Sequence, residues 1–120
     1  MKIIIAGSRK FDDHAHHLIR YAVHLSGFDV TEVVSGGAEG IDEYGEIWAE
    51  SKTIPVCVFK ADWQKHGKKA GPIRNGQMAE YGDALIAIWD GVSPGTKDMI
   101  AQMKRRRKPV FRLLVGFDRA

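Results

Sequence analysis

Short apolar runs that end in glycine-rich turns are the feature that most constrains the fold of this chain. A buried strand that passes through such a turn into a helix leaves free backbone N–H groups at the positive end of that helix. This geometry suits a phosphate group, so several such turns in one small domain predict a phosphorylated ligand, most simply a nucleotide. The apolar runs and their turns are 3–6 with 7–9, 30–34 with 35–42, and 84–89 with 90–96.

Strand-like and helix-like patterns alternate along the whole sequence. Continuous β-branched or apolar runs indicate buried strands, and apolar residues at helical spacing indicate the helices between them. Residues 61–71 have no clear period and are expected to form an irregular loop. The expected strands are 2–6, 30–34, 54–59, 83–88 and 110–115. The expected helices run from Asp12 or Asp13 to Gly27, from 38 to about 52, from Pro72 to about Tyr81, and from Gly95 or Thr96 into the run 104–108.

This alternation predicts an α/β fold in which right-handed crossovers build a parallel sheet covered by helices on both faces. We expect one domain, residues 1–120, with a doubly wound five-stranded sheet of order 3-2-1-4-5. In such a sheet the connections after strands one and four leave toward opposite faces, and ligands bind in the crevice outside their carboxyl ends. The first and third glycine-rich turns fall at that point, and the second lies beside it.

Composition narrows the class of protein. The chain has 120 residues, 44% of them hydrophobic, and contains no apolar run of the roughly 20 residues that a membrane span needs. Its only cysteine, Cys57, lies in an apolar run and is interpreted as a core residue in a reducing compartment. No secretory signal precedes Gly7, so we expect a cytoplasmic protein that does not associate with membranes.

The formal net charge of +3 comes from one segment, because the run Lys104-Arg105-Arg106-Arg107-Lys108 carries five positive charges and the rest of the chain sums to −2. The run falls where a helix should end, and cations there favour the negative end of the helix dipole. We interpret it as a solvated helix end. Nucleic-acid binding is the alternative, which the absence of interleaved aromatic residues makes the weaker one.

Several ordered blocks occur along the sequence, namely 6–11, 34–42, 61–63, 67–75 with Met78, 85–91, and Gly95-Thr96. Together they resemble the YspA/YpsA-related family of the SLOG superfamily. The resemblance implies a Rossmann-like domain, distantly related to the LOG phosphoribohydrolases and to DprA, that binds a nucleotide or a nucleotide-derived molecule such as ADP-ribose or an NAD-like compound. It covers residues 2 to 115.

The candidate site residues follow from these turns and blocks. We expect Gly7, Ser8 and Arg9 to hold a phosphate, with Ser35, Gly36, Gly37 and Gly40 forming a backbone cradle. Asp42 either binds a ribose hydroxyl or caps its helix, and Gly95 and Thr96 donate to phosphate. Arg74 and Asn75 are expected to close over the ligand, Trp63 to stack on a base or anchor its loop, and Trp89 to line the pocket.

Two functional classes remain open. In the first, the domain binds its ligand as a sensor or a sequestering module. In the second, it hydrolyses an N-glycosidic bond as the LOG enzymes do, with Asp98 or Asp90 as the catalytic carboxylate. The sequence departs from those enzymes at two points, because Ser93-Pro94-Gly95-Thr96 keeps only part of their Pro-Gly-Gly-x-Gly-Thr loop and Asp98 stands where they carry glutamate. The histidines at 14, 16 and 17 lack a further ligand, so we expect neither a metal nor a separate cofactor. The apolar residues at 44, 47 and 48 leave room for a homo-oligomer.

Overall fold

The computed structural model describes residues 1–11 and 13–116 and has the alternating order of elements that the sequence predicts. No helix within these ranges has the length and apolar character needed to cross a membrane. The elements in chain order are β1 (Lys2–Gly7), α1 (His14–Ser26), β2 (Glu32–Ser35), α2 (Ile41–Ser51), β3 (Val56–Val58), α3 (Trp63–His66), the 3-10 turn η1 (Gly67–Lys69), α4 (Ala70–Tyr81), β4 (Ala84–Trp89), α5 (Pro94–Arg105) and β5 (Val110–Leu114).

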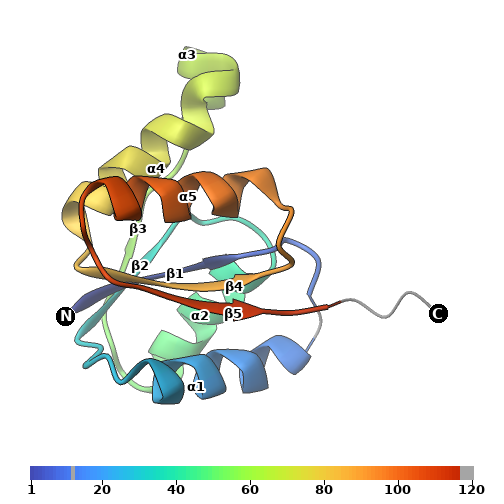
Figure 1. The fold of residues 1–120 in the computed structure, drawn as a ribbon, viewed down its shortest axis with the longest axis vertical. Helices are drawn as coiled ribbons and strands as arrows, with labels where there is room; N and C mark the ends of the chain where they lie inside the picture. Colours follow the sequence, from blue (N-terminus) through green and yellow to red (C-terminus); the bar gives the residue numbers. More distant parts are fainter. Residues whose placement is uncertain (12, 117–120) are drawn as a thin grey trace.

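The five strands form one parallel sheet of order β3-β2-β1-β4-β5, which confirms the predicted fold. Helices α1 and α2 cover one face, and α4 and α5 cover the other (Figure 1). The central pair is β1 and β4, joined in register from Ile3 opposite Ala84 to Gly7 opposite Ile88. The carboxyl ends of these two strands therefore lie next to each other at one edge of the sheet.

The central strands are apolar throughout because both of their faces are covered. Side chains alternate along a strand, so Ile3 and Ile5 join the core beneath α1 and α2, while Ile4 and Ala6 join the core beneath α4 and α5. All six residues of β4 are buried. This rigid centre fixes where the turns after β1 and β4 must lie.

The edge of the sheet and the segment after it differ from the sequence-based expectation. Strand β3 covers three residues instead of 54–59, and Cys57 in it is half-buried, not a core residue. The expected irregular loop at 61–71 forms α3, η1 and the start of α4. The Asp62 carboxylate accepts a hydrogen bond from the Lys65 N–H at 3.1 Å and so begins α3. A helix this short has no period to detect, and its cap is the only local signal.

The first helix begins as predicted but without its expected cap. Asp13 occupies the capping position, yet its side chain makes no capping hydrogen bond. Asp12, the other candidate, lies outside the described residues. The C-terminal end follows the prediction, because Gly27 adopts the left-handed conformation at a φ of 70°.

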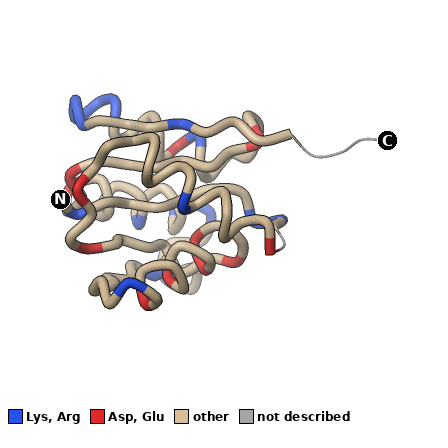
Figure 2. The backbone as a smooth tube through the Cα atoms, turned by 90° about the horizontal axis from the view of Figure 1, so that it is seen from below, with Lys and Arg blue, Asp and Glu red and all other residues tan. Residues whose placement is uncertain are grey.

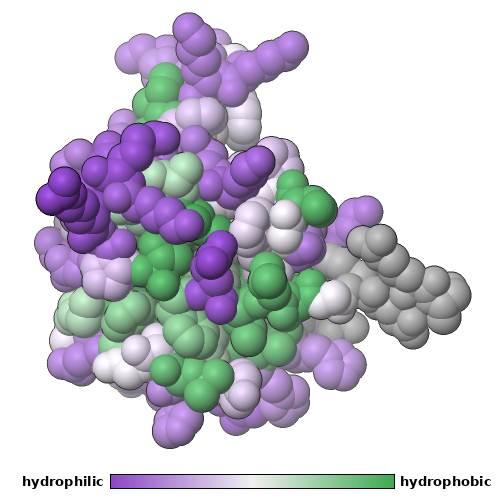
Figure 3. All heavy atoms as spheres, in the orientation of Figure 1, coloured by the Kyte–Doolittle hydropathy of each residue, from purple (hydrophilic) through white to green (hydrophobic). Residues whose placement is uncertain are grey.

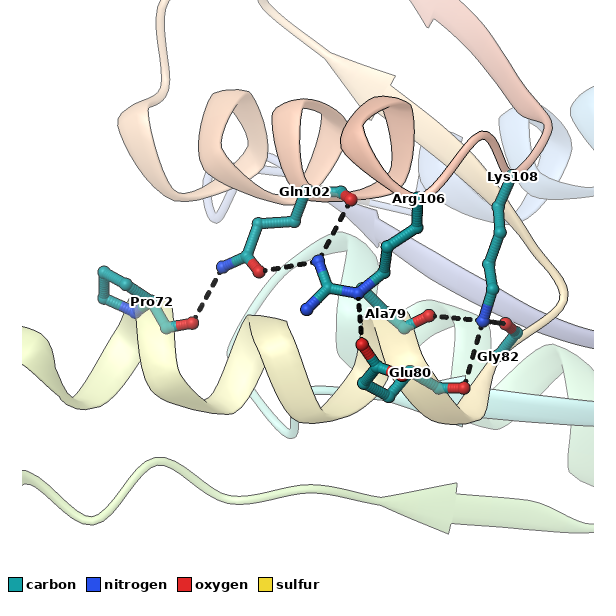
Figure 4. A network of polar contacts seen from close by, with 7 residues as sticks. All are labelled: Pro72, Ala79, Glu80, Gly82, Gln102, Arg106 and Lys108. Carbon is teal, nitrogen blue, oxygen red and sulfur yellow. Dashed lines mark hydrogen bonds and ion pairs between the residues drawn. The ribbon is translucent and has the colours of Figure 1, made fainter.

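The basic run 104–108 forms the tight connection from α5 to β5, at the upper left of Figure 2. Lys104 and Arg105 end α5, as expected. Lys108 instead turns to the neighbouring helix, where its Nζ donates to the carbonyls of Ala79, Glu80 and Gly82 at 2.7, 3.0 and 2.8 Å (Figure 4). These carbonyls lie at the end of α4, so one ammonium group satisfies acceptors that the helix leaves open.

We expect Lys108→Met to lower the free energy of unfolding by about 2 kcal/mol, because it removes charge-assisted hydrogen bonds from a half-buried helix end. Lys104→Met removes the same charge from an exposed position of α5 and should change it by less than about 0.5 kcal/mol. Urea unfolding followed by circular dichroism measures both. Equal losses in the two variants would mean that net charge, not the contact with α4, determines the effect.

Candidate functional site

A cavity of about 550 Å³ opens at the carboxyl ends of β1 and β4, the position that the topology predicts. Of the residues described in the structure, nine of the predicted site residues line it and seven do not. The nine are Gly7, Ser8, Arg9, Asp42, Arg74, Asn75, Asp90, Gly95 and Thr96. The seven outside the lining are Ser35, Gly36, Gly37, Gly40, Trp63, Trp89 and Asp98.

The turn after β1 is tied directly to the end of β4. The Ser8 N–H donates to the Ile88 carbonyl at 3.2 Å, and the Ser8 hydroxyl accepts from the Asp90 N–H at 3.3 Å. A Cβ on Gly7 would lie 2.0 Å from the Ile88 carbonyl oxygen, so no other residue fits there. The first and third glycine-rich turns are thus held together by hydrogen bonds at the strand ends.

The second turn supports the first from behind. The Ile41 N–H donates to the Ser8 carbonyl at 3.1 Å, and a Cβ on Gly40 would lie 2.5 Å from the carbonyl oxygens of Ser8 and Arg9. The Ser35 hydroxyl donates to Glu46 at 2.6 Å and accepts from the Gly37 N–H at 3.1 Å. Ser35, Gly37 and Gly40 therefore shape the wall of the cavity without lining it.

A buried carboxyl group and a guanidinium group form one wall of the cavity. Arg74 Nη1 donates to the Gly36 carbonyl at 2.5 Å, and a Cβ on Gly36 would lie 2.6 Å from this nitrogen and 2.9 Å from Asp42 Oδ2. Gly36 thus leaves space for both side chains. Arg74 Nε also donates to Asn75 Oδ1 at 3.0 Å, which links two neighbouring lining residues.

Burial dominates the protonation of this pair. Desolvation raises the pKa of Asp42 to about 6, against the opposing effects of the Ala38 and Gly7 N–H groups and the Arg74 charge. Desolvation also lowers the pKa of Arg74, an effect strengthened by the nearby charge of Arg9 and opposed by Asp42. With a pKa of about 6, the Asp42 carboxyl group is mostly ionised at neutral pH and takes up a proton in mildly acidic solution.

The third turn is braced by Asp90. Its carboxylate accepts hydrogen bonds from the N–H groups of Val92 and Ser93 at 2.9 and 2.8 Å and from the Ser93 hydroxyl at 2.7 Å. Desolvation acts to raise the pKa of Asp90, but these bonds and one from Ser8 outweigh it and lower the pKa to about 2. Trp89 closes the same turn, because its Nε1 donates to the Ser93 carbonyl at 3.1 Å. Asp90 is thus an anion whose oxygens hold the turn in shape.

Asp98, the other predicted catalytic residue, joins two helices outside the cavity lining. Its Oδ2 accepts from Asn75 Nδ2 at 3.0 Å and from Gln102 Nε2 at 3.1 Å. The Asn75 amide donates in addition to the Gly95 carbonyl at 3.1 Å. Asp98 therefore positions Asn75 at the cavity rather than facing the cavity itself.

The remaining lining residues add charge and an apolar surface that the sequence analysis did not assign to the site. Lys10 follows Arg9, and both side chains are exposed at the cavity. Met78 and Met99 contribute apolar walls from α4 and α5. Their helical spacing predicts burial, but spacing alone does not separate a core position from a cavity wall.

We expect the free energy of unfolding to fall as the pH rises from about 4 to 6, because folding raises the pKa of Asp42 from 3.8 to about 6 and the unfolded chain releases that proton first. Asp42→Asn should remove this dependence and stabilise the protein at pH 7.5 by on the order of 2 kcal/mol. Thermal unfolding across this pH range measures the effect. Glu43→Gln, an exposed change in the same helix turn, should keep the wild-type slope, and an unchanged slope in Asp42→Asn would contradict the assignment.

Comparison with known proteins places this chain in a family. The DNA processing protein A (DprA) of Streptococcus pneumoniae has the same fold, with a TM-score of 0.77 and 15% sequence identity. The match covers 97% of this chain and 51% of DprA, so the chain spans about half the length of that protein. The Gene 61 protein of Mycobacterium phage D29 is 32% identical over 118 residues, which are 92% of this chain and 94% of that protein. The model of the YspA, cpYpsA-related SLOG family matches residues 1–66. The chain belongs to this family.

Proposed function

We propose that the cavity binds a nucleotide or a nucleotide-derived molecule, such as ADP-ribose, an NAD-like compound or a nucleoside phosphate, and that the protein acts as a sensor or a sequestering module. The observation that carries the proposal is the combination of groups around one cavity. Arg9, Lys10 and Arg74 supply positive charge, and Met78 and Met99 supply apolar surface. A phosphate needs the former, and a base or ribose packs on the latter.

The first turn of α5 adds a second phosphate-binding feature. Gly95 and Thr96 lie in this turn and line the cavity, where the N–H groups of a helix have no partner within the helix. The positive end of the helix dipole is directed to the same place. A Cβ on Gly95 would meet no atom within 4 Å, so open space adjoins this backbone. The volume of about 550 Å³ lies within the range of small-molecule sites.

Hydrolysis of an N-glycosidic bond in the same ligand has less support than binding. Such a reaction needs a carboxyl group directed at the sugar carbon. The oxygens of Asp90 hold the turn after β4, and Asp98 is bonded to Asn75 and Gln102. Asp42 is the carboxyl group of the lining whose pKa is raised, to about 6, so detection of a released base distinguishes hydrolysis from binding.

Nucleic-acid binding by the run 104–108 has less support as well. Arg106 forms an ion pair with Glu80 at 2.7 Å, and Lys108 is bonded to the end of α4. Two of its five cations thus serve contacts within the fold.

We expect ADP-ribose, NAD, AMP or GMP to raise the melting temperature by several degrees at a hundred times the dissociation constant, because binding then adds about 2.7 kcal/mol. Arg9→Met should weaken that binding at least about tenfold, because an exposed lining cation is lost without a cost to folding. Arg20→Met, on the exposed side of α1, is the matched control. Chromatography after incubation separates the two functions, since intact ligand indicates binding and free base indicates hydrolysis. Absence of a shift with every compound would overturn the proposal.

A further inference from the structure

A basic arm projects from the domain away from the sheet. The arm consists of residues 60–69, which include α3 and η1, and it stands clear at the top of the view in Figure 1. Figure 3 shows this projection as a largely hydrophilic surface. Within the described chain, none of these residues lines the cavity. The proposed function therefore gives them no role.

The arm carries an excess of positive charge. Its four lysines are all exposed, and Asp62, its one acidic residue, caps α3 with its carboxylate. The arm therefore has a net charge of +3. The lysines are Lys60, Lys65, Lys68 and Lys69. A small projecting surface with this charge attracts a polyanion at moderate ionic strength.

An aromatic ring stands among these lysines. Trp63 is 54% exposed, although tryptophan is a residue that folding normally buries. A Cβ on Gly71 would lie 3.5 Å from Trp63 Cη2, so the ring rests on the first turn of α4. The capped helix and this contact hold the indole in place while most of its surface stays accessible. The arm is thus an ordered platform with a flat apolar surface and surrounding point charges.

We propose that the basic arm binds single-stranded nucleic acid, with the Trp63 indole stacked on a base and the lysines contacting adjacent phosphates. Stacking accepts any base, because every base has a π-face, and lysines neutralise the backbone without reading sequence. A duplex keeps its bases stacked inside and presents no free base to the indole. An acidic peptide would satisfy the lysines but offers no planar base for the indole. The combination of groups therefore favours an unpaired strand.

The test measures binding of fluorescein-labelled dT12 and U12 by anisotropy over a range of salt concentrations. Trp63→Ala should weaken binding about tenfold, the loss typical of one stacked base. The triple variant Lys65→Gln, Lys68→Gln, Lys69→Gln should weaken it further and reduce the slope of log K against log salt by about 2, because each lost phosphate contact on a single strand removes about 0.7. Trp63 is exposed, so its variant should fold, which an unchanged melting temperature verifies.

A matched control removes the same charge elsewhere. The triple variant Lys104→Gln, Arg105→Gln, Arg107→Gln changes exposed cations of the 104–108 run and leaves Arg106 and Lys108 in their contacts. It should bind either oligomer within about twofold of the wild type. Equal weakening of oligomer binding by both triple variants would overturn the proposal, and so would wild-type affinity in Trp63→Ala. The proposal would also fail if the protein bound a duplex as tightly as a single strand. It would fail likewise if poly-glutamate bound as tightly as the oligomers and independently of Trp63.

Arg9→Met separates this proposal from the function of the cavity. It should bind the oligomers as the wild type does, and saturating ADP-ribose should not displace them. Loss of oligomer binding in Arg9→Met with retention in Trp63→Ala would assign the strand to the cavity and overturn the role of the basic arm. The protein could also bind the oligomers through Trp63 and yet bind no mononucleotide. That result would support the role of the basic arm and overturn the proposal for the cavity.

Discussion

The close backbone approach between the end of β1 and its neighbours is the constraint on which the site depends. The Ser8 N–H reaches the Ile88 carbonyl on one side, and the Ser8 carbonyl accepts from the Ile41 N–H on the other. Both contacts require glycine, because a Cβ on Gly7 or Gly40 would overlap backbone oxygens. Three turns from distant parts of the chain are thereby brought to one point. The glycines act first by permitting this approach, and the cavity exists because the turns meet around it.

The same convergence determines the electrostatics of the cavity. Asp42 and Arg74 come from different helices and meet beside Gly36, where Asp42 is buried and Arg74 is half-buried. Burial costs a carboxylate more than the neighbouring guanidinium returns, so the pKa of Asp42 rises, while Arg74 keeps backbone acceptors at Gly36 and Phe59. The cations of the lining, Arg9, Lys10 and Arg74, still outnumber its carboxyl groups, Asp42 and Asp90. Such a wall is suited to an anionic ligand.

The sequence predicts an element well where its signal is local, and less well where contacts with distant residues determine a side chain's role. Strands β1 and β4 are continuous apolar runs, and the alternation of strands and helices indicates a parallel sheet, so both are predictable. The roles of Ser35 and Asp98 are not, because each is defined by a partner on another element, Glu46 for the first and Asn75 for the second. Trp63 illustrates the same limit. Its place in a polar segment marks it as unusual, but only the short helix before α4 decides that it stands outside the cavity.

Helix α4 connects these features, and its contacts with α5 explain how it holds Arg74 in place. Apolar packing is non-directional and lets one helix slide along another, whereas hydrogen bonds fix a register. Gln102 Nε2 donates to the Pro72 carbonyl at 2.9 Å near the start of α4, and Arg106 and Lys108 bind its last turn (Figure 4). A Cβ on Gly76 would lie 3.2 Å from Gln102 Oε1, so the glycine permits this approach. Polar contacts at both ends therefore fix the position of α4 along its axis. They also fix the distance between the Arg74 guanidinium at the cavity and the basic arm that precedes the helix.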